Sequence, residues 1–559
     1  MRDFGKITMG ELVDHTSINY PDNDALVCPD RGLRYSYKEF REISNQFAKG
    51  LLKLGVKRGE NIAIWATNVP EWVITQFGSA RIGAVMATVS TSYKLLELEY
   101  QLKQSDATTL IMIEGTRHSD FINLIYELCP ELSECKPGEL VSKRLPLLKN
   151  VIMIGNNEYP GMFTWNDVIK LGEEVSDEAL TSRSATLDPD DAIVMIYTSG
   201  TTGFPKGVML THHNIIANAK AQAECLNLGP SDRMCIAVPF FHCFGIVASN
   251  VCCVVSGAAM VPVELFNPVQ VLKTVEKEQC TVLHGVPTMF ILELEQMEKE
   301  KYDVSSLRTG IVAGSACSPD VVKQLAEVMN MREIITSYGQ SEASPCITST
   351  RINDSIELKA TTVGKALPGV EVKLVNPETG EEVALGEQGE ICARGYNIMK
   401  GYYKMPEATA ATIDEEGWLH TGDLGIMDEY GYCKITCRLK EMIIRGGENI
   451  YPKEVEEFLR IHPLIKDAQV VGVPSEKFGE EVMAFIRVKD GHVLTPESVQ
   501  NFCKGQIANW KIPRYVAFVE DYPYTANGKV QKFKLREMAI EILDPQEVIK
   551  PGNVCKVLV

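Results

Sequence analysis

Helix and strand signals alternate along this 559-residue chain, and the alternation limits the folds open to it. Ser36 and Glu39 form a capping box ahead of apolar residues spaced three and four apart, which predicts a helix. Residues 61–65 then read as a strand, Pro70 opens another helix, and residues 84–89 return to strand. Strands that alternate with helices form mostly parallel sheets with helices over their faces. The sequence therefore predicts an α/β fold.

The pattern changes in the last third of the chain. Residues 370–375, 390–394 and 432–436 are short strand-like units separated by Gly and Pro, which indicates a smaller β-rich subdomain. After Arg438 the alternation resumes, with Pro452 at the start of a predicted helix.

Composition excludes several classes of protein. The chain has 56 Lys and Arg against 74 Asp and Glu, a net charge of −18, which argues against nucleic-acid binding through clustered positive charge. Its 16 cysteines include no CxxC pair, so we expect reduced thiols and a cytoplasmic location. The first residues lack the apolar core of a signal peptide. Residues 246–261 are too short and too polar to span a bilayer, so no integral membrane segment is expected.

A loop rich in glycine and hydroxyl groups follows the apolar strand signal at residues 192–196. Glycines let backbone N–H groups approach an anion, while hydroxyls and a lysine add donors and charge. The loop differs from the common nucleotide loop, in which Ser or Thr follows the lysine, because here Gly207 follows Lys206. A surface loop is the alternative for a generic stretch of this composition. The candidate polyphosphate-binding residues here are Thr198, Ser199, Gly200, Thr201, Thr202, Gly203, Phe204, Pro205 and Lys206.

Residues 198–207 resemble the signature of the adenylate-forming superfamily, which includes acyl-CoA synthetases, adenylation domains of peptide synthetases and firefly-luciferase-like enzymes. Further motifs of that superfamily follow in order at residues 337–342, 417–423, 438–452 and 525–529. They cover nearly the whole chain. One departure is Ser341, which stands where the superfamily usually has threonine but keeps the hydroxyl.

The resemblance implies a two-part architecture. It implies a large N-terminal AMP-binding domain, residues 1–437, built of two βα-layered subdomains and a small β-rich subdomain. A small mobile α+β lid, residues 438–559, would follow a hinge at 438–440 that contains Lys440.

The resemblance also implies the ATP-binding residues outside the loop. Glu342 and Thr198 would hold Mg²⁺, which prefers hard oxygen ligands. Asp423 would accept hydrogen bonds from the ribose hydroxyls, with Arg438 beside it. The adenine-side and neighbouring residues would be Gly314, Ser315, Ser337, Tyr338, Gly339, Gln340 and Ser341.

Lys529 is the implied catalytic lysine of the first half-reaction. A carboxylate must attack a polyanion, and an ammonium group offsets that repulsion. Lys206 and Glu342 would assist with charge, and His242 would border the acyl pocket and the thiol tunnel. Gly446 and Gly447 would let the pantetheine arm of coenzyme A pass close to the backbone.

The acyl pocket would be lined by His242, Val286 and Thr288. No acidic residue occurs between Arg233 and Glu264, where an enzyme for amino acids needs one to pair the substrate ammonium. We therefore expect an AMP-forming acyl-CoA synthetase with ATP, Mg²⁺ and coenzyme A, acting on a medium- or long-chain fatty acid.

Other readings stay open at this stage. They are an adenylating enzyme that loads a carrier protein with an aryl or other carboxylate, a luciferase-like oxygenase, and a catalytically silent sensor of nucleotides or acyl-AMP. The expected partners are small molecules only: a carboxylate, ATP and coenzyme A. The sequence leaves the oligomeric state undecided, with a homodimer among the options.

Overall fold

The computed structural model describes residues 5–543, except residues 118, 199–204, 316, 446–447, 476–477, 505, 508 and 526–528. The chain forms two compact units. The first comprises Met1–Val372 and Ala393–Leu419, and the second comprises Lys373–Cys392 and His420–Val559. Both mix helices with sheets, so the predicted α/β class is confirmed. The boundary after residue 437 and the hinge at 438–440 stay predictions.

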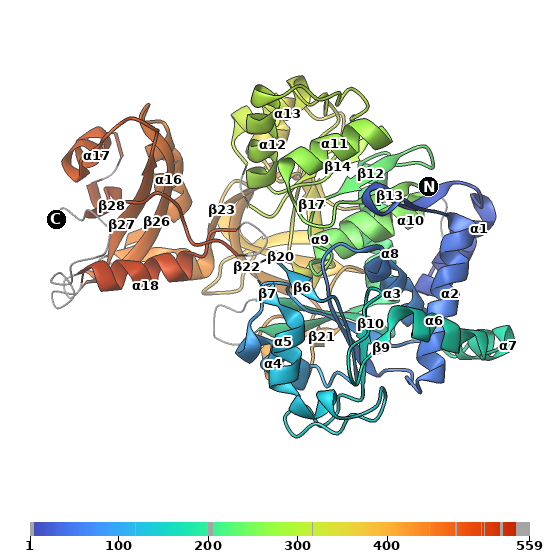
Figure 1. Ribbon diagram of the computed structural model, residues 1–559. Coiled ribbons are helices and arrows are strands. Elements are labelled where there is room, and N and C mark those ends of the chain that lie inside the picture. Colours follow the sequence, from blue (N-terminus) through green and yellow to red (C-terminus); the bar gives the residue numbers. More distant parts are fainter. Residues whose placement is uncertain are drawn as a thin grey trace. The chain divides into compact units, whose positions relative to one another are not determined.

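The first unit contains an eight-stranded sheet with a parallel centre, and helices surround it (Figure 1). The predicted strand at 61–65 is β3 (Asn61–Trp65), and all five of its residues are buried. Its buried apolar run is typical of a central parallel strand. The spatial order of the eight strands is β21 (Gly401–Tyr402), β11 (Lys206–Thr211), β10 (Ala192–Thr198), β4 (Val85–Thr88), β3, β5 (Thr109–Met112), β8 (Asn150–Met153) and β9 (Phe163–Thr164).

The predicted capping box starts helix α2 (Tyr37–Lys53), where the Ser36 hydroxyl accepts from the Glu39 N–H and the Glu39 carboxylate accepts from the Ser36 N–H. The apolar face of α2 packs against α3 (Pro70–Arg81) and α6 (Trp165–Glu173). The other helices of the first unit are α1 (Met9–Asn19), η1 (Pro29–Arg31), α4 (Leu95–Gln104), α5 (Phe121–Leu128), η2 (Pro130–Ser133), α7 (Asp177–Ser184), α8 (His212–Cys225), α9 (Cys243–Gly245), η3 (Ile246–Val251), α10 (Cys252–Ser256), α11 (Pro268–Glu278), α12 (Pro287–Lys299), α13 (Pro319–Glu327), η4 (Ser341–Ala343), α14 (Ile356–Thr361) and α15 (Pro406–Ala410).

The first unit contains two further sheets of four or more strands. One has the order β14 (Val282–Leu283), β12 (Arg233–Ile236), β13 (Ala259–Pro262), β1 (Asp24–Cys28), β2 (Leu33–Ser36). The other has the order β15 (Ile311–Val312), β16 (Ile335–Gly339), β17 (Cys346–Ser349), β18 (Lys365–Ala366). A small ribbon pairs β6 (Gly115–Thr116) with β7 (Ser119–Asp120).

The apolar stretch at 246–261 is buried, as predicted. It forms a π-helical turn, helix α10 and most of β13, with Gly257 at φ +76° between the last two. Among the described residues, no helix is both long enough and apolar enough to cross a bilayer. All fifteen cysteines in the described part of the chain are free thiols.

The second unit is built on an antiparallel pair, β26 (Ile465–Ser475) and β27 (Gly479–Val488). Alternate residues of β27 face opposite sides. Val482, Ala484 and Ile486 pack with α16 (Pro452–Arg460) and α17 (Pro496–Cys503), while Met483 and Phe485 pack with α18 (Lys532–Leu543). The remaining elements of the chain, of which β19, β20 and β22 each have residues in both units, are β19 (Val370–Val375), β20 (Gln388–Gly395), β22 (Leu419–Met427), β23 (Cys433–Arg438), η5 (Leu439–Glu441), β24 (Ile443–Arg445), β25 (Glu448–Ile450), η6 (Asn509–Lys511) and β28 (Tyr515–Phe518).

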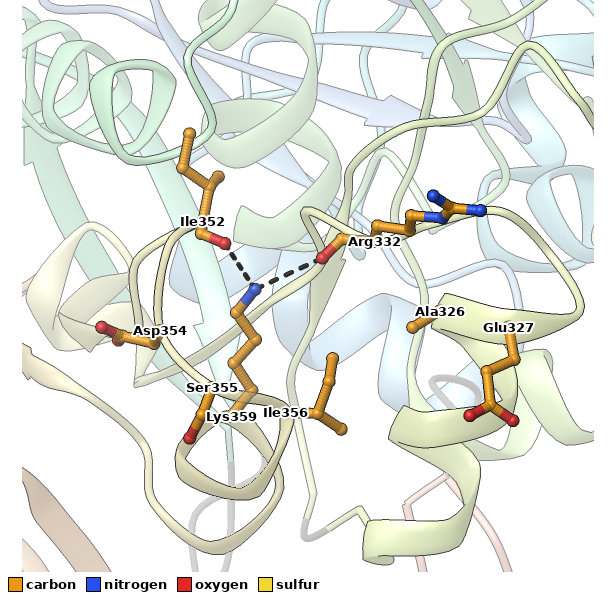
Figure 2. A pocket seen from close by; sticks show the side chains of 8 residues that line it. All are labelled: Ala326, Glu327, Arg332, Ile352, Asp354, Ser355, Ile356 and Lys359. Carbon is orange, nitrogen blue, oxygen red and sulfur yellow. Dashed lines mark hydrogen bonds between the residues drawn. The ribbon is translucent and has the colours of Figure 1, made fainter.

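The first unit contains a cavity of about 570 Å³. Its lining residues are Ala326, Glu327, Arg332, Ile352, Asp354, Ser355, Ile356 and Lys359. Figure 2 shows the Lys359 ammonium turned towards the carbonyl oxygens of Ile352 and Arg332, at 2.7 and 3.4 Å. Burial lowers the pKa of this lysine. None of the residues predicted to bind ATP or the acyl group lines this cavity.

Candidate active site

Four predicted segments of the first unit follow neighbouring parallel strands. Strand β12 pairs in parallel with β14, single parallel bridges join the β14 region to the β15 region, and β15 pairs in parallel with β16. The carboxyl ends of such strands meet at one edge, which is where α/β proteins bind ligands. The segments that reach this edge contain His242, Val286, Gly314–Ser315 and Ser337–Gly339. Residues that the sequence links only through separate motifs therefore gather at one edge.

His242 caps the short helix α9. Its Nδ1 accepts a hydrogen bond from the Phe244 N–H at 3.2 Å, so the ring is anchored to the chain that follows it. The next residue reaches the neighbouring segment, because the Cys243 Sγ lies 3.6 Å from the Ser341 Oγ. The predicted acyl-side segment and the segment containing Glu342 are thus in contact. Val286 is buried and Thr288 half-buried at the start of α12.

His284 is a site-edge residue that sequence reasoning missed. Its Nδ1 accepts from the Ile311 N–H and its Nε2 donates to the Ala248 carbonyl, both at 3.1 Å. Complete burial lowers its pKa to about 4, so the ring is neutral near pH 7. It stacks on Phe244 with ring centroids 5.6 Å apart and thereby supports the His242 segment. Its position directly after the short apolar strand β14 gave no signal beyond that of a core histidine.

The backbone of the second motif is closely packed. A Cβ at Gly339 would lie 1.9 Å from the Pro345 carbonyl oxygen, so only glycine fits there. The Ser337 hydroxyl is 2.9 Å from that of Ser349 on the adjacent strand. Gly314 has φ +90°, which a residue with a side chain rarely adopts. Gly314 and Ser315 are exposed, Tyr338 and Gln340 are half-buried, and Ser341 is buried.

The predicted phosphate loop joins β10 to β11, which pair antiparallel with Thr198 opposite Lys206. The loop is therefore the connection of a hairpin rather than a link from strand to helix. Pro205 at its end accepts a hydrogen bond from the Tyr100 hydroxyl at 3.1 Å. The loop residues Ser199, Gly200, Thr201, Thr202, Gly203 and Phe204 lie outside the described residues.

Tyr402 joins two predicted site residues and was missed by the sequence. The Lys206 ammonium lies 4.4 Å from the centre of the Tyr402 ring. The Tyr402 hydroxyl donates a hydrogen bond to the Glu342 carboxylate at 2.7 Å. Burial, and then the negative charge of Glu342, raise the pKa of Tyr402, so the phenol keeps its proton. Tyr402 reaches this position because β21 pairs with β11, a contact between segments nearly two hundred residues apart.

Asp423 and Arg438 lie opposite each other on β22 and β23 of the second unit. The Arg438 Nε is 3.1 Å from the Asp423 Oδ1. The arginine side chain is 44% exposed and the aspartate 12%, so the carboxylate is oriented by a partner that is itself accessible. This pair has the acceptor and donor groups that the sequence predicted for a ribose site.

Two hydrogen bonds join Lys529 to Thr525. The Thr525 N–H donates to the Lys529 carbonyl at 2.7 Å, and the Lys529 N–H donates to the Thr525 hydroxyl at 3.1 Å. The lysine side chain is half-buried, and Lys440 is exposed in η5. Gly446 and Gly447 lie outside the described residues.

A partly buried ion cluster connects the predicted hinge segment to the helix that follows Lys529. Lys532 at the start of α18 lies 2.7 Å from Glu456 and 3.4 Å from Glu441, which follows Lys440. Burial lowers the pKa of Lys532, but the two carboxylates outweigh burial and raise it, so the lysine stays charged. This cluster, which the sequence did not reveal, holds the start of α18 close to η5 within the second unit.

Two family models match the chain: "AMP-binding enzyme" over residues 13–403 and "AMP-binding enzyme C-terminal domain" over residues 454–529. Over 96% of this chain and 98% of its own length, the Bacillus subtilis protein named "Putative acyl-CoA synthetase YngI" is 56% identical. The zebrafish mitochondrial medium-chain acyl-CoA ligase ACSF2 is 41% identical over 95% of this chain and 88% of its own.

Solved structures agree with the sequence matches. The crystal structure of the anthranilate CoA ligase AuaEII in complex with anthranoyl-AMP superposes with a TM-score of 0.83. It is 27% identical, and the match covers 96% of this chain and 97% of that one. The predicted resemblance is thus confirmed.

Proposed function

The chain belongs to the AMP-binding enzyme family, and we propose that it is an acyl-CoA synthetase that joins a fatty acid to coenzyme A at the cost of ATP. The observation that carries the proposal is the contact chain Lys206, Tyr402, Glu342, which presents an ammonium and a carboxylate beside the predicted phosphate loop. Such a site suits a polyphosphate with its counter-ion.

The first half-reaction forms an acyl-adenylate. A carboxylate oxygen of the fatty acid attacks the α-phosphorus of ATP, and the bond to the bridging oxygen breaks so that pyrophosphate leaves with the electron pair. The ammonium of Lys529 would lie between the two anions and offset their repulsion. Lys206 would hold phosphate oxygens, while Asp423, oriented by Arg438, would accept from the ribose hydroxyls.

Magnesium fits the donors that the site offers. Glu342 and Thr198 supply a carboxylate and a hydroxyl, which are hard oxygen ligands, and when bound the ion would neutralise part of the phosphate charge. The hydrogen bond from Tyr402 holds one oxygen of Glu342 and leaves the other available. The role of Tyr402 would therefore be to keep the Glu342 carboxylate oriented.

The second half-reaction transfers the acyl group. The sulfur of coenzyme A attacks the acyl carbonyl carbon, the bond from that carbon to the AMP oxygen breaks, and the thiol proton passes to solvent. We propose that residues 438–559 act as a lid that first presents Lys529 and then presents Gly446 and Gly447. The ion cluster of Lys532 with Glu441 and Glu456 supports movement of η5 and α18 as one body.

A medium- or long-chain fatty acid is the proposed substrate. The segment from Arg233 to Glu264 has no acidic residue to pair with an amino acid's ammonium, and Val286 and Phe244 add apolar surface. The name of the zebrafish relative supports the medium-chain range. A cytoplasmic location and a homodimer stay predictions from the sequence.

Release of AMP across a panel of carboxylates, with and without coenzyme A, tests the function. We expect sustained release only with coenzyme A and the highest kcat/KM with unbranched fatty acids of about eight to fourteen carbons. Amino acids should give at least about 100-fold less, because their ammonium group would be desolvated without a partner. Release without coenzyme A but with a carrier protein would favour the loading enzyme instead, and no release with any acid would favour a sensor.

A further inference from the structure

Three residues with metal-binding side chains converge on neighbouring strands of the second unit. Glu390 and Cys392 are two positions apart on β20 and so share one face of that strand, and His420 lies on the adjacent strand β22. Their ligand atoms, a carboxylate oxygen, the Sγ and an imidazole nitrogen, lie within 4.8 Å of one another. The mechanism proposed above uses none of the three.

The spacing of these atoms is close to that of a tetrahedral site. The Cys392 Sγ is 3.5 Å from the His420 Nδ1, and the Glu390 Oε2 is 2.9 Å from the same nitrogen. A zinc ion with ordinary bond lengths to sulfur, nitrogen and oxygen separates those pairs by about 3.6 and about 3.3 Å. The first separation fits as it stands, and the second requires an opening of a few tenths of an ångström when the hydrogen bond is replaced by the metal.

Hydrogen bonds join the strands around the three residues. The Thr421 hydroxyl, next to His420, donates to the Ile391 carbonyl between the other two ligands at 2.7 Å. The second oxygen of Glu390 accepts from the Gly422 N–H at 2.9 Å, so the carboxylate is already oriented. Glu390 and Cys392 are buried, whereas the His420 side chain is 34% exposed, which leaves a path for an ion to enter.

We propose that Glu390, Cys392 and His420 bind a borderline-soft divalent cation of the zinc class, with solvent in the fourth position. The mixture of thiolate, imidazole and carboxylate selects such an ion over magnesium, which prefers oxygen ligands alone. Because the site connects β20 to β22 directly before Asp423, the bound metal would stabilise that pair of strands. The site is independent of the proposed acyl-CoA synthetase activity.

Cobalt is the probe, because a cobalt ion bound to a thiolate shows an intense charge-transfer absorption that oxygen and nitrogen ligands do not give. The test adds Co²⁺ and then Zn²⁺ to the reduced full-length protein and to the variants Cys392→Ser and His420→Gln. Cys433→Ser is the matched control, since Cys433 is another buried thiol on the nearby strand β23. Circular dichroism confirms that each variant is folded.

We expect one equivalent of Co²⁺ to produce the thiolate band in the parent and in Cys433→Ser, and one equivalent of Zn²⁺ to abolish it. Cys392→Ser should lose the band, and His420→Gln should bind at least about 10-fold more weakly. Zn²⁺ should also raise the melting temperature of the parent more than that of either ligand variant. The proposal is overturned if the parent gives no band, or if the band survives in Cys392→Ser, since another of the chain's thiols would then be the ligand.

Discussion

Replacing Lys529 with alanine is expected to abolish carboxylate-dependent exchange of pyrophosphate into ATP, with a loss of at least about 100-fold in rate. The reason is electrostatic, because a carboxylate must then approach the α-phosphate against negative charge that Lys529 no longer offsets. Thioester formation from supplied acyl-AMP should remain within a few-fold of the parent, since no new bond to phosphorus forms in that step. Radiolabelled pyrophosphate exchange and acyl-CoA formation, measured on the same preparation, separate the two effects.

Lys534→Ala is the matched control for this experiment. Lys534 is an exposed lysine on α18, a few residues beyond the turn that carries Lys529, so its removal changes the charge by the same amount. The control should retain normal exchange. Normal exchange in Lys529→Ala, or equal loss of both half-reactions, would remove Lys529 from the proposed role.

Glu342→Gln is expected to have the second large effect, on the magnesium requirement. The amide keeps the shape of the side chain and an oxygen to accept from Tyr402, but it removes the negative charge that suits a divalent cation. We expect the Mg²⁺ concentration for half-maximal AMP formation to rise about 10-fold or more, with a lower maximal rate. The measurement is a magnesium titration of AMP formation at saturating fatty acid.

Tyr402→Phe provides a graded version of the same test. It deletes only the hydroxyl that donates to Glu342 at 2.7 Å, while the ring beneath Lys206 remains. Its magnesium requirement should therefore rise less than that of Glu342→Gln. Glu357→Gln, which changes an exposed carboxylate on α14, should leave the titration unchanged. An unaltered titration in Glu342→Gln would contradict the assignment of Glu342 to the metal.

Local sequence patterns predicted the elements well. The strand at 61–65 and the helix begun by Ser36 and Glu39 are present, because a buried parallel strand and a helix cap leave short-range signals. The strand predicted at 84–89 is shorter in the structure, at Val85–Thr88. The ends of such elements depend on tertiary contacts as well as on local sequence.

The contacts that orient the candidate site could not be read from the sequence. Tyr402 meets Glu342 because a two-residue strand pairs with β11, and no periodicity marks so short a strand. Lys532 meets Glu441 and Glu456 across three separate elements. The motifs predicted which charged and hydroxyl residues belong to the site. The pairing of distant segments determines which of these residues are held in place.

The central claim is that a carboxylate attacks the α-phosphorus of ATP before the thiol attacks the acyl carbon. Decanoic acid labelled with oxygen-18 in both carboxylate oxygens tests this claim most directly, with ATP, Mg²⁺ and coenzyme A as the other reactants. One labelled oxygen should appear in AMP and the other in decanoyl-CoA, with equal amounts of the two products by mass spectrometry. Label in orthophosphate together with ADP, or unlabelled AMP beside decanoyl-CoA, would contradict the acyl-adenylate route.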